Sequence, residues 1–292
     1  MWLVAINPHS GNGRGEVIAR EVLRYLALHD ISYLSIAGRS AEELSSLLIS
    51  EIESESNTNR FEGVIAVGGD GLAHLVFQVC VPKRLPFAVI PAGTGNDFVR
   101  TLGWSLENIE PLLERVTTSP PTEIDLGIVD SEWFGAILST GFDSVVNERA
   151  NSLSWPKGPN RYNLSIAMEL PRFTPRKYTI TYDGNTFESE AMLVAIGNGR
   201  SYGGGMNICP QARLDDGLFD IVILKPVSKV EFIRTFPKVY SGTHISHPQV
   251  KVLRASKVSI FADAIAYADG ERIGPAPISA ECVKGAGLTW TL

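Results

Sequence analysis

Two glycine-rich loops that each carry an aspartate could do chemistry. The first is Gly68-Gly69-Asp70-Gly71, directly after the apolar run 64–67, and the second spans residues 91–97, after the apolar run 87–90. Turns of this kind expose backbone N–H groups that bind phosphate, and a carboxylate beside them can hold a metal ion or a hydroxyl. Each loop alone is more often a tight turn, but the pair favours a nucleotide site.

A third loop, residues 7–15, follows the apolar run 2–6 and contains Gly11, Gly13 and Gly15. It lacks the Lys-Ser/Thr ending of a P-loop, and its glycine spacing differs from the dinucleotide-binding fingerprint. Three such loops at one sheet edge would make a nucleotide site more probable than three unrelated turns.

The elements around these loops predict how they are positioned. Apolar runs at 2–6, 33–36, 64–67 and 87–90 alternate with helical patterns, and Ser40 with Glu43 forms a capping box for one helix. Such alternation indicates a parallel sheet whose strand-to-helix loops all lie at the carboxyl edge. We therefore expect Asp70 and Asp97 to face a common space.

The pattern changes near residues 117–121, where Thr, Ser and Pro are concentrated. Beyond it short strands dominate, including a hairpin around Asp183-Gly184 and strands at 191–196, 218–224, 251–261 and 264–268. Helical patterns are few, at 162–170 and 229–240. The expected fold is α/β with two domains: a Rossmann-like open parallel sheet over 1–120, to which residues 283–292 could return, and an antiparallel β-sandwich or barrel over 121–282.

Composition limits the class of protein. The 292 residues carry a net charge of −6, which argues against nucleic acid as a partner. Three widely spaced cysteines suit a reducing compartment, and no apolar run reaches the ~20 residues of a membrane span. We expect a cytoplasmic protein with at most peripheral membrane contact; a homodimer stays open.

The motifs together resemble the diacylglycerol kinase catalytic domain family, which includes soluble bacterial diacylglycerol kinases and sphingosine kinases. The resemblance covers nearly the whole chain. It rests on Asn7-Pro8-His9-Ser10-Gly11, Gly68-Gly69-Asp70-Gly71, Pro91-Ala92-Gly93-Thr94-Gly95-Asn96-Asp97-Phe98, Asn198-Gly199-Arg200-Ser201-Tyr202-Gly203-Gly204-Gly205-Met206, Pro210-Gln211-Ala212, Asp215-Asp216-Gly217-Leu218-Phe219-Asp220, Gly242-Thr243-His244 and Asp269-Gly270-Glu271.

The resemblance implies transfer of the ATP γ-phosphoryl group to a lipid hydroxyl, diacylglycerol-like or sphingoid, with ATP and Mg²⁺ as cofactors. It implies that Asp70 and Asp97 hold Mg²⁺ through waters, that Asp125 is an acid near the same site, and that Glu271 is the general base. The nucleotide contacts that it implies are Asn7, Ser10, Gly11, Arg39, Gly68, Gly69, Asp70, Gly71, Gly93, Thr94 and Asn96.

Two of these assignments have plain alternatives. Asp-Gly-Glu triplets are ordinary surface turns, so the assignment of Glu271 as the general base depends on its match to the family motif. Asp216, with the carbonyls of Arg213 and Leu218, is implied to hold a structural Mg²⁺, but Asp215-Asp216-Gly217 is equally typical of a turn.

Other functions stay open at this point. Leu75 stands where the family has Glu, which leaves a catalytically weak nucleotide or lipid binder as one alternative. An NAD kinase-like enzyme, which shares Gly-Gly-Asp-Gly, is another. Arg172, Phe173, Arg176 and Lys177 form a basic cluster with an aromatic residue, either a solvated loop or a transient contact with an anionic membrane.

Overall fold

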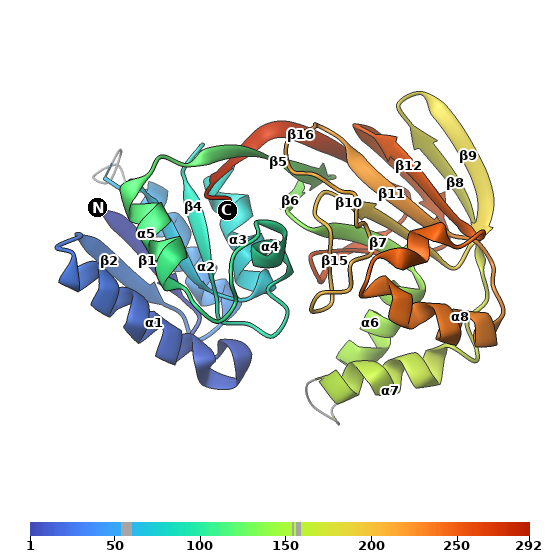
Figure 1. Ribbon diagram of the computed structural model, residues 1–292, viewed down its shortest axis with the longest axis horizontal. Coiled ribbons are helices and arrows are strands. Elements are labelled where there is room, and N and C mark those ends of the chain that lie inside the picture. The colour runs from blue at the N-terminus through green and yellow to red at the C-terminus, as the bar shows by residue number, and fades with distance from the viewer. Residues whose placement is uncertain (54–59, 154, 156–158) are drawn as a thin grey trace. The chain divides into compact units, whose positions relative to one another are not determined.

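The computed structural model describes residues 1–53, 60–153, 155 and 159–292 (Figure 1). The chain forms two compact units. The first contains Met1–Leu126 together with Lys284–Leu292, and the second contains Gly127–Val283. Each unit is considered by itself below.

The first unit is built on a parallel four-stranded sheet in the order β2-β1-β3-β4. Strands β1, β3 and β4 are buried at every position, as their continuous apolar runs predict. The strands are β1 (Trp2–Ile6), β2 (Tyr33–Ala37), β3 (Gly63–Gly68) and β4 (Phe87–Pro91).

Several α-helices accompany this sheet in the described part of the unit. The predicted cap of α2 is confirmed, since the Glu43 N–H donates to Ser40 Oγ at 3.1 Å. Helix α1 begins inside the glycine loop at residues 7–15, and Gly11, Asn12 and Gly13 break its first turn with left-handed φ angles. The helices are α1 (Ser10–Leu28), α2 (Ala41–Glu53), α3 (Asp70–Cys80), α4 (Asp97–Thr101) and α5 (Glu110–Thr118).

The second unit contains most of two six-stranded sheets, in the orders β12-β11-β10-β7-β14-β15 and β6-β5-β16-β13-β8-β9. Leu138 and Ile221 of one sheet share a buried core with Ile180, Ile260 and Ile278 of the other. Two sheets with a common apolar core form the expected sandwich.

The strands of these two sheets lie between residues 122 and 289. Strands β5 and β16 continue across the division between the units. The strands are β5 (Thr122–Val129), β6 (Glu132–Phe134), β7 (Ile137–Gly141), β8 (Arg176–Tyr182), β9 (Asn185–Ala191), β10 (Leu193–Gly197), β11 (Phe219–Leu224), β12 (Val250–Ala255), β13 (Lys257–Ala262), β14 (Ile265–Ala268), β15 (Glu271–Pro275) and β16 (Ile278–Thr289).

One strand prediction was wrong. Residues 251–261 form two strands, because β12 pairs with β11 and β13 pairs with β8 and β16 in the other sheet. The break at Ser256 is held by Asp183, whose carboxylate accepts the N–H groups of Ser256 and Lys257 at 3.0 and 2.9 Å. The same Asp183 begins the turn of the β8–β9 hairpin, which is confirmed.

The helices of the second unit differ in two places from the prediction. Helix α6 was not predicted; it follows Gly141, whose φ of 111° turns the chain out of β7. The helical segment predicted over 229–240 divides at Pro237, which lies in the first turn of a tighter 3₁₀ segment. These elements are α6 (Phe142–Ser152), α7 (Pro159–Glu169), α8 (Lys229–Thr235) and the 3₁₀ segments η2 (Phe236–Val239) and η3 (Thr243–Ser246).

Candidate functional site

The three glycine-rich loops of the first unit meet at one edge of the parallel sheet. A Cβ on Gly93 would lie 2.6 Å from the Cα of Gly69, so these two backbones touch. A Cβ on Gly11, where φ is +57°, would lie 2.1 Å from the carbonyl oxygen of Ala92. Only glycine allows this approach, so the loops expected to converge are packed directly on one another.

The backbone around this contact suits phosphate. Helix α3 begins at Asp70, with Gly69 as the residue before it, and the N–H groups in the first turn of a helix have no partner within the helix. Ser10 Oγ lies 3.5 Å from the point where a Cβ on Gly69 would stand. The edge therefore offers backbone N–H groups and a hydroxyl to an anion.

Asn96 shapes the loop at residues 91–97. Its side-chain oxygen accepts the Gly93 N–H and its amide nitrogen donates to the Gly93 carbonyl, both at 2.9 Å. The residue is buried, with a left-handed φ of 54°. Asn96 thus holds Gly93 and Thr94 in place from within the loop.

Asp70 and Asp97 lie together, as their predicted positions at the sheet edge require. Asp70 Oδ1 accepts the N–H of Asp97 at 2.7 Å and thereby caps the short helix α4. A Cβ on Gly95 would lie 2.5 Å from Asp70 Oδ2 and 3.1 Å from Asp97 Oδ2, so both oxygens border one small space. Two carboxylate oxygens around such a space fit a hard divalent cation, which Mg²⁺ sites typically complete with waters and phosphates.

Two further predicted residues of the first unit, Asp125 and Arg39, make contacts of their own. Asp125 is buried in β5 and accepts the Gly285 N–H at 2.9 Å, so it ties β5 to the returning end of the chain. Arg39 is 92 % exposed and pairs with Glu43 at the start of α2. Among the residues that the structure describes, no group of three or more His, Cys, Asp or Glu side chains could hold a metal ion.

Glu271 opens β15 in the second unit and is exposed. The turn that carries it is anchored by Asp269, whose carboxylate accepts the N–H groups of Gly135, Ala136 and Ile137 at 2.7, 2.8 and 3.2 Å. Left-handed φ angles at Asp269 and Gly270 then direct the chain into β15.

A second anchor lies on the other side of Glu271. Arg272 and Tyr267 both donate to Glu148 Oε1 of α6, at 2.7 and 2.8 Å. These hydrogen bonds, that of Arg272 first, lower the pKa of Glu148. Glu271 is therefore presented by a turn that is fixed on both sides.

Asp216, the residue implied to hold a structural Mg²⁺, pairs with an arginine. Asp216 Oδ1 accepts the Leu218 N–H at 3.1 Å, and its other oxygen pairs with Arg254, which also binds Asp220 at 2.8 Å. Arg213 directs its guanidinium to Asp215. A guanidinium thus supplies a positive charge beside Asp216, and the structural Mg²⁺ implied there stays a prediction.

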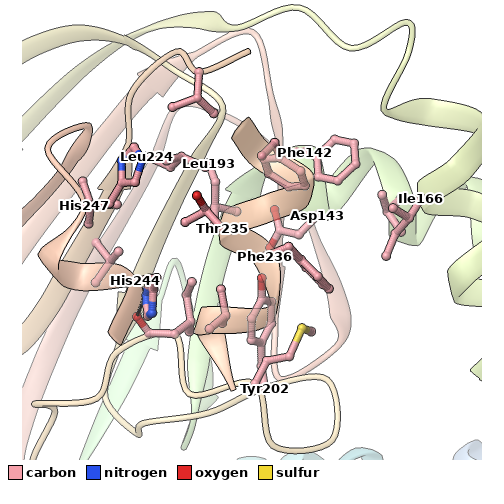
Figure 2. A pocket seen from close by; sticks show the side chains of 18 of the residues that line it. Phe142, Asp143, Ile166, Leu193, Tyr202, Leu224, Thr235, Phe236, His244 and His247 are labelled. Atoms are coloured by element: carbon pink, nitrogen blue, oxygen red, sulfur yellow. Dashed lines mark hydrogen bonds between the residues drawn. The ribbon is translucent and has the colours of Figure 1, made fainter. Parts of the chain in front are cut away.

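An apolar pocket lies within the second unit (Figure 2). Its volume is about 60 Å³, room for several waters. Nearly all of its wall is apolar. The lining includes Phe142, Val146, Tyr162, Ile166, Leu193, Met206, Ile208, Val222, Leu224, Phe232, Phe236 and Val239.

One carboxyl group enters this apolar surface. Figure 2 shows Asp143 of α6 among the lining side chains, near Phe142 and Phe236. Burial raises the pKa of Asp143 to about 6, and hydrogen bonds from Ser139 and Ser144 offset this only in part. Burial likewise lowers the pKa of His244, whose Nε2 donates to the Ile208 carbonyl.

The basic cluster also differs from its predicted form. Phe173 is buried and packs against Phe142 with ring centroids 5.3 Å apart, so the aromatic ring cannot meet a membrane. Arg176 opens β8 and lies 4.0 Å from Asp263. No helix that the structure describes is long and apolar enough to cross a bilayer.

Fold and site together define a two-domain protein, in which glycine-rich loops meet at one edge of a parallel sheet and a β-sandwich follows. Residues 1–129 match the family model described as the diacylglycerol kinase catalytic domain, and residues 136–288 match the YegS C-terminal NAD kinase beta sandwich-like domain. The chain belongs to the diacylglycerol kinase family and is a lipid kinase of that type.

Individual relatives agree with this membership. The chain is 34 % identical to the diacylglycerol kinase of Mycobacterium tuberculosis, over 96 % of its own length and 91 % of the relative's. It is 32 % identical to that of Bacillus subtilis, over 70 % of this chain and 69 % of the relative. The crystal structure of a diacylglycerol kinase from Bacillus anthracis matches it with a TM-score of 0.74 and 20 % identity, covering 100 % and 96 % of the two chains, which shows the common fold.

Sequence reasoning missed Asp143 and the anchoring roles of Asp269 and Glu148. Asp143 carried a signal, since a carboxyl group directly after Gly-Phe at the end of an apolar run is unusual. Helices α7 and α8 pack against α6 and bury Asp143. The sequence pattern does not reveal this packing.

Proposed function

We propose that this protein transfers the γ-phosphoryl group of ATP to the hydroxyl of a lipid, in a reaction that requires Mg²⁺. The observation that carries the proposal is the contact of the Gly69 and Gly93 loops beside Asp70 and Asp97. Phosphoryl transfer needs mainly positioned donors and charge neutralisation, and this edge has the groups for both.

Each residue has a part in the proposed reaction. The backbone of Gly69, Gly71 and Thr94 would hold the phosphates, and Asp70 and Asp97 would hold the Mg²⁺ ion. When bound, the ion would neutralise charge on the phosphate oxygens.

Glu271 accepts the proton of the acceptor hydroxyl. The hydroxyl oxygen then bonds to the γ-phosphorus while the bond from that phosphorus to the β–γ bridging oxygen breaks, leaving ADP. The anchored turn supports this role, because a general base must keep a defined geometry.

The pocket of the second unit supports a lipid as acceptor. An apolar cavity with a single carboxyl group fits a hydrocarbon chain with a polar end. The relatives' printed names make diacylglycerol the first acceptor to examine.

The direct test offers γ-labelled ATP and Mg²⁺ with diacylglycerol, monoacylglycerol, phosphatidylglycerol or a sphingoid base in mixed micelles. We expect label in one of these lipids and none when Mg²⁺ is chelated. A parallel assay offers NAD as the acceptor, and label in NAD but in no lipid would establish the NAD kinase alternative. ATP binding without transfer to any acceptor would establish the binder suggested by Leu75.

A further inference from the structure

The segment formed by α8 and η2 is apolar on both of its sides. Phe232, Phe236 and Val239 face inward and line the pocket. On the outer side Val230, Ile233 and Tyr240 are exposed by 58, 61 and 56 %. Exposed apolar side chains that gather in one short segment mark an interaction surface more often than scattered ones do, so this outer side calls for a partner.

The charges beside this outer side are mainly positive. Residues 228–241 carry Lys229, Arg234 and Lys238 against the single carboxylate of Glu231, in a chain whose net charge is −6. Arg234 and Lys238 are exposed, whereas Glu231 pairs with His247 at 3.1 Å. The protein thus places cations next to exposed apolar side chains although it is acidic as a whole.

The surroundings extend this surface. Lys229 Nζ donates to the carbonyl of Phe173 and lies over its ring, which brings the basic segment with the exposed Arg172 beside the start of α8. Phe173 itself is buried. Arg172 therefore adds an exposed cation near the start of α8.

We propose that this face, defined by Val230, Ile233, Arg234, Lys238 and Tyr240, docks on an anionic lipid bilayer. Apolar side chains enter the interface while cations meet the anionic headgroups, the usual arrangement of interfacial helices. The proposal rests on the proposed function in one respect: the same segment is the wall of the pocket assigned to the acceptor's chain.

The test is sedimentation with vesicles, without ATP. Ile233→Glu replaces an apolar contact by a negative charge, and we expect at least a ~10-fold loss of partition onto vesicles of phosphatidylglycerol and phosphatidylcholine. Val17→Glu on α1, where Val17 is 49 % exposed, makes the same kind of change on the other unit and should bind like the unchanged protein. Equal binding by the Ile233→Glu variant overturns the proposal.

A second variant guards against misfolding of the first. Arg234→Ser with Lys238→Ser leaves the apolar packing intact, and we expect a ~10-fold or greater loss on anionic vesicles but little change on pure phosphatidylcholine. Equal loss on both vesicle types, or on neither, contradicts the docking face. Ultracentrifugation without vesicles tests whether a second copy of this chain occupies the face instead. A dimer that the Ile233→Glu substitution dissociates would assign the face to that second copy.

Vesicle binding and catalysis can fail separately. Phosphorylation of a short-chain acceptor dispersed as monomers needs no bilayer, so the Ile233→Glu variant should retain this activity. If the unchanged protein binds vesicles through α8 but phosphorylates no lipid, the proposed function fails and the docking face stands. If the unchanged protein phosphorylates the monomeric acceptor but Ile233→Glu leaves vesicle binding unchanged, the docking face fails and the proposed function stands.

Discussion

At the scale of single residues, the space beside Gly95 lies between the two carboxylates that we propose hold Mg²⁺. Two like-charged carboxylates border it, and Asp70 is fixed there by the N–H of Asp97. Such an arrangement is favourable when a cation separates the charges.

Gly95→Ala tests this space directly. The methyl group would lie 2.5 Å from Asp70 Oδ2 and must displace that carboxylate. We expect the Mg²⁺ concentration for half-maximal activity to rise at least ~10-fold, with calorimetry of Mg²⁺–ATP binding showing the same weakening. An unchanged Mg²⁺ titration would remove Asp70 and Asp97 from the metal site.

Glu271→Gln tests the general base. Loss of such a base typically lowers turnover by ~10²–10⁴, while ATP binding should persist because the amide keeps the size of the side chain. Glu188→Gln on β9, also an exposed glutamate of the second unit, serves as the control. Near-normal turnover of the Glu271→Gln variant would show that the proton has another acceptor.

Asp143 makes stability depend on pH. Because burial raises its pKa to about 6, the folded protein holds this proton over a range in which the unfolded chain has released it. The contribution of this group to stability is therefore full below about pH 4 and is lost as the pH rises through 6, by roughly 3 kcal/mol. Denaturant unfolding at pH 4 and 7.5 should show this loss relative to Asp143→Asn, whose amide does not ionise; parallel pH curves for the two proteins would refute it.

At the scale of elements, the turn between β14 and β15 shows how a loop becomes rigid enough to carry a reactive group. A single carboxylate, Asp269, receives three successive N–H groups from the start of β7, and Glu148 of α6 holds Arg272. These hydrogen bonds fix the conformation of the turn against the sheet and the helix.

Asp269→Asn should loosen this turn. The amide keeps one acceptor oxygen but directs an NH₂ group at backbone N–H groups, which costs about 1.5–3 kcal/mol of stability. We expect kcat to fall while KM for ATP changes little, since Asp269 acts by positioning Glu271. Asp263→Asn is the matched control, because the Asp263 side chain is fully exposed; an equal effect of both variants would contradict the positioning role.

At the scale of the whole molecule, the chain inserts its second unit between β5 and the end of β16. Residues 284–292 then return to the first unit. There the ring centroids of Trp290 and Trp2 lie 5.8 Å apart, and the Trp290 carbonyl accepts the Trp104 indole N–H at 2.6 Å. Both ends of the chain therefore stabilise the same unit.

Trp290→Ala should show this dependence. Trp290 is buried, and removal of a buried Trp costs about 3–5 kcal/mol. We expect the unfolding transition of the first unit, followed by protection against proteolysis, to move to lower denaturant concentration. Trp155→Ala removes a side chain that is 76 % exposed and should leave this transition unchanged.

The sequence by itself determined the parallel sheet, its loops and the neighbourhood of Asp70 and Asp97. These follow from local rules, since apolar runs specify buried strands and parallel strands bring their carboxyl ends to one edge. Only the tertiary structure decided the break at Ser256, the guanidinium of Arg254 beside Asp216, and the burial of Asp143 and Phe173. Each depends on residues far apart in the sequence, such as Asp183 with Ser256, and no periodicity encodes which distant side chain completes a contact.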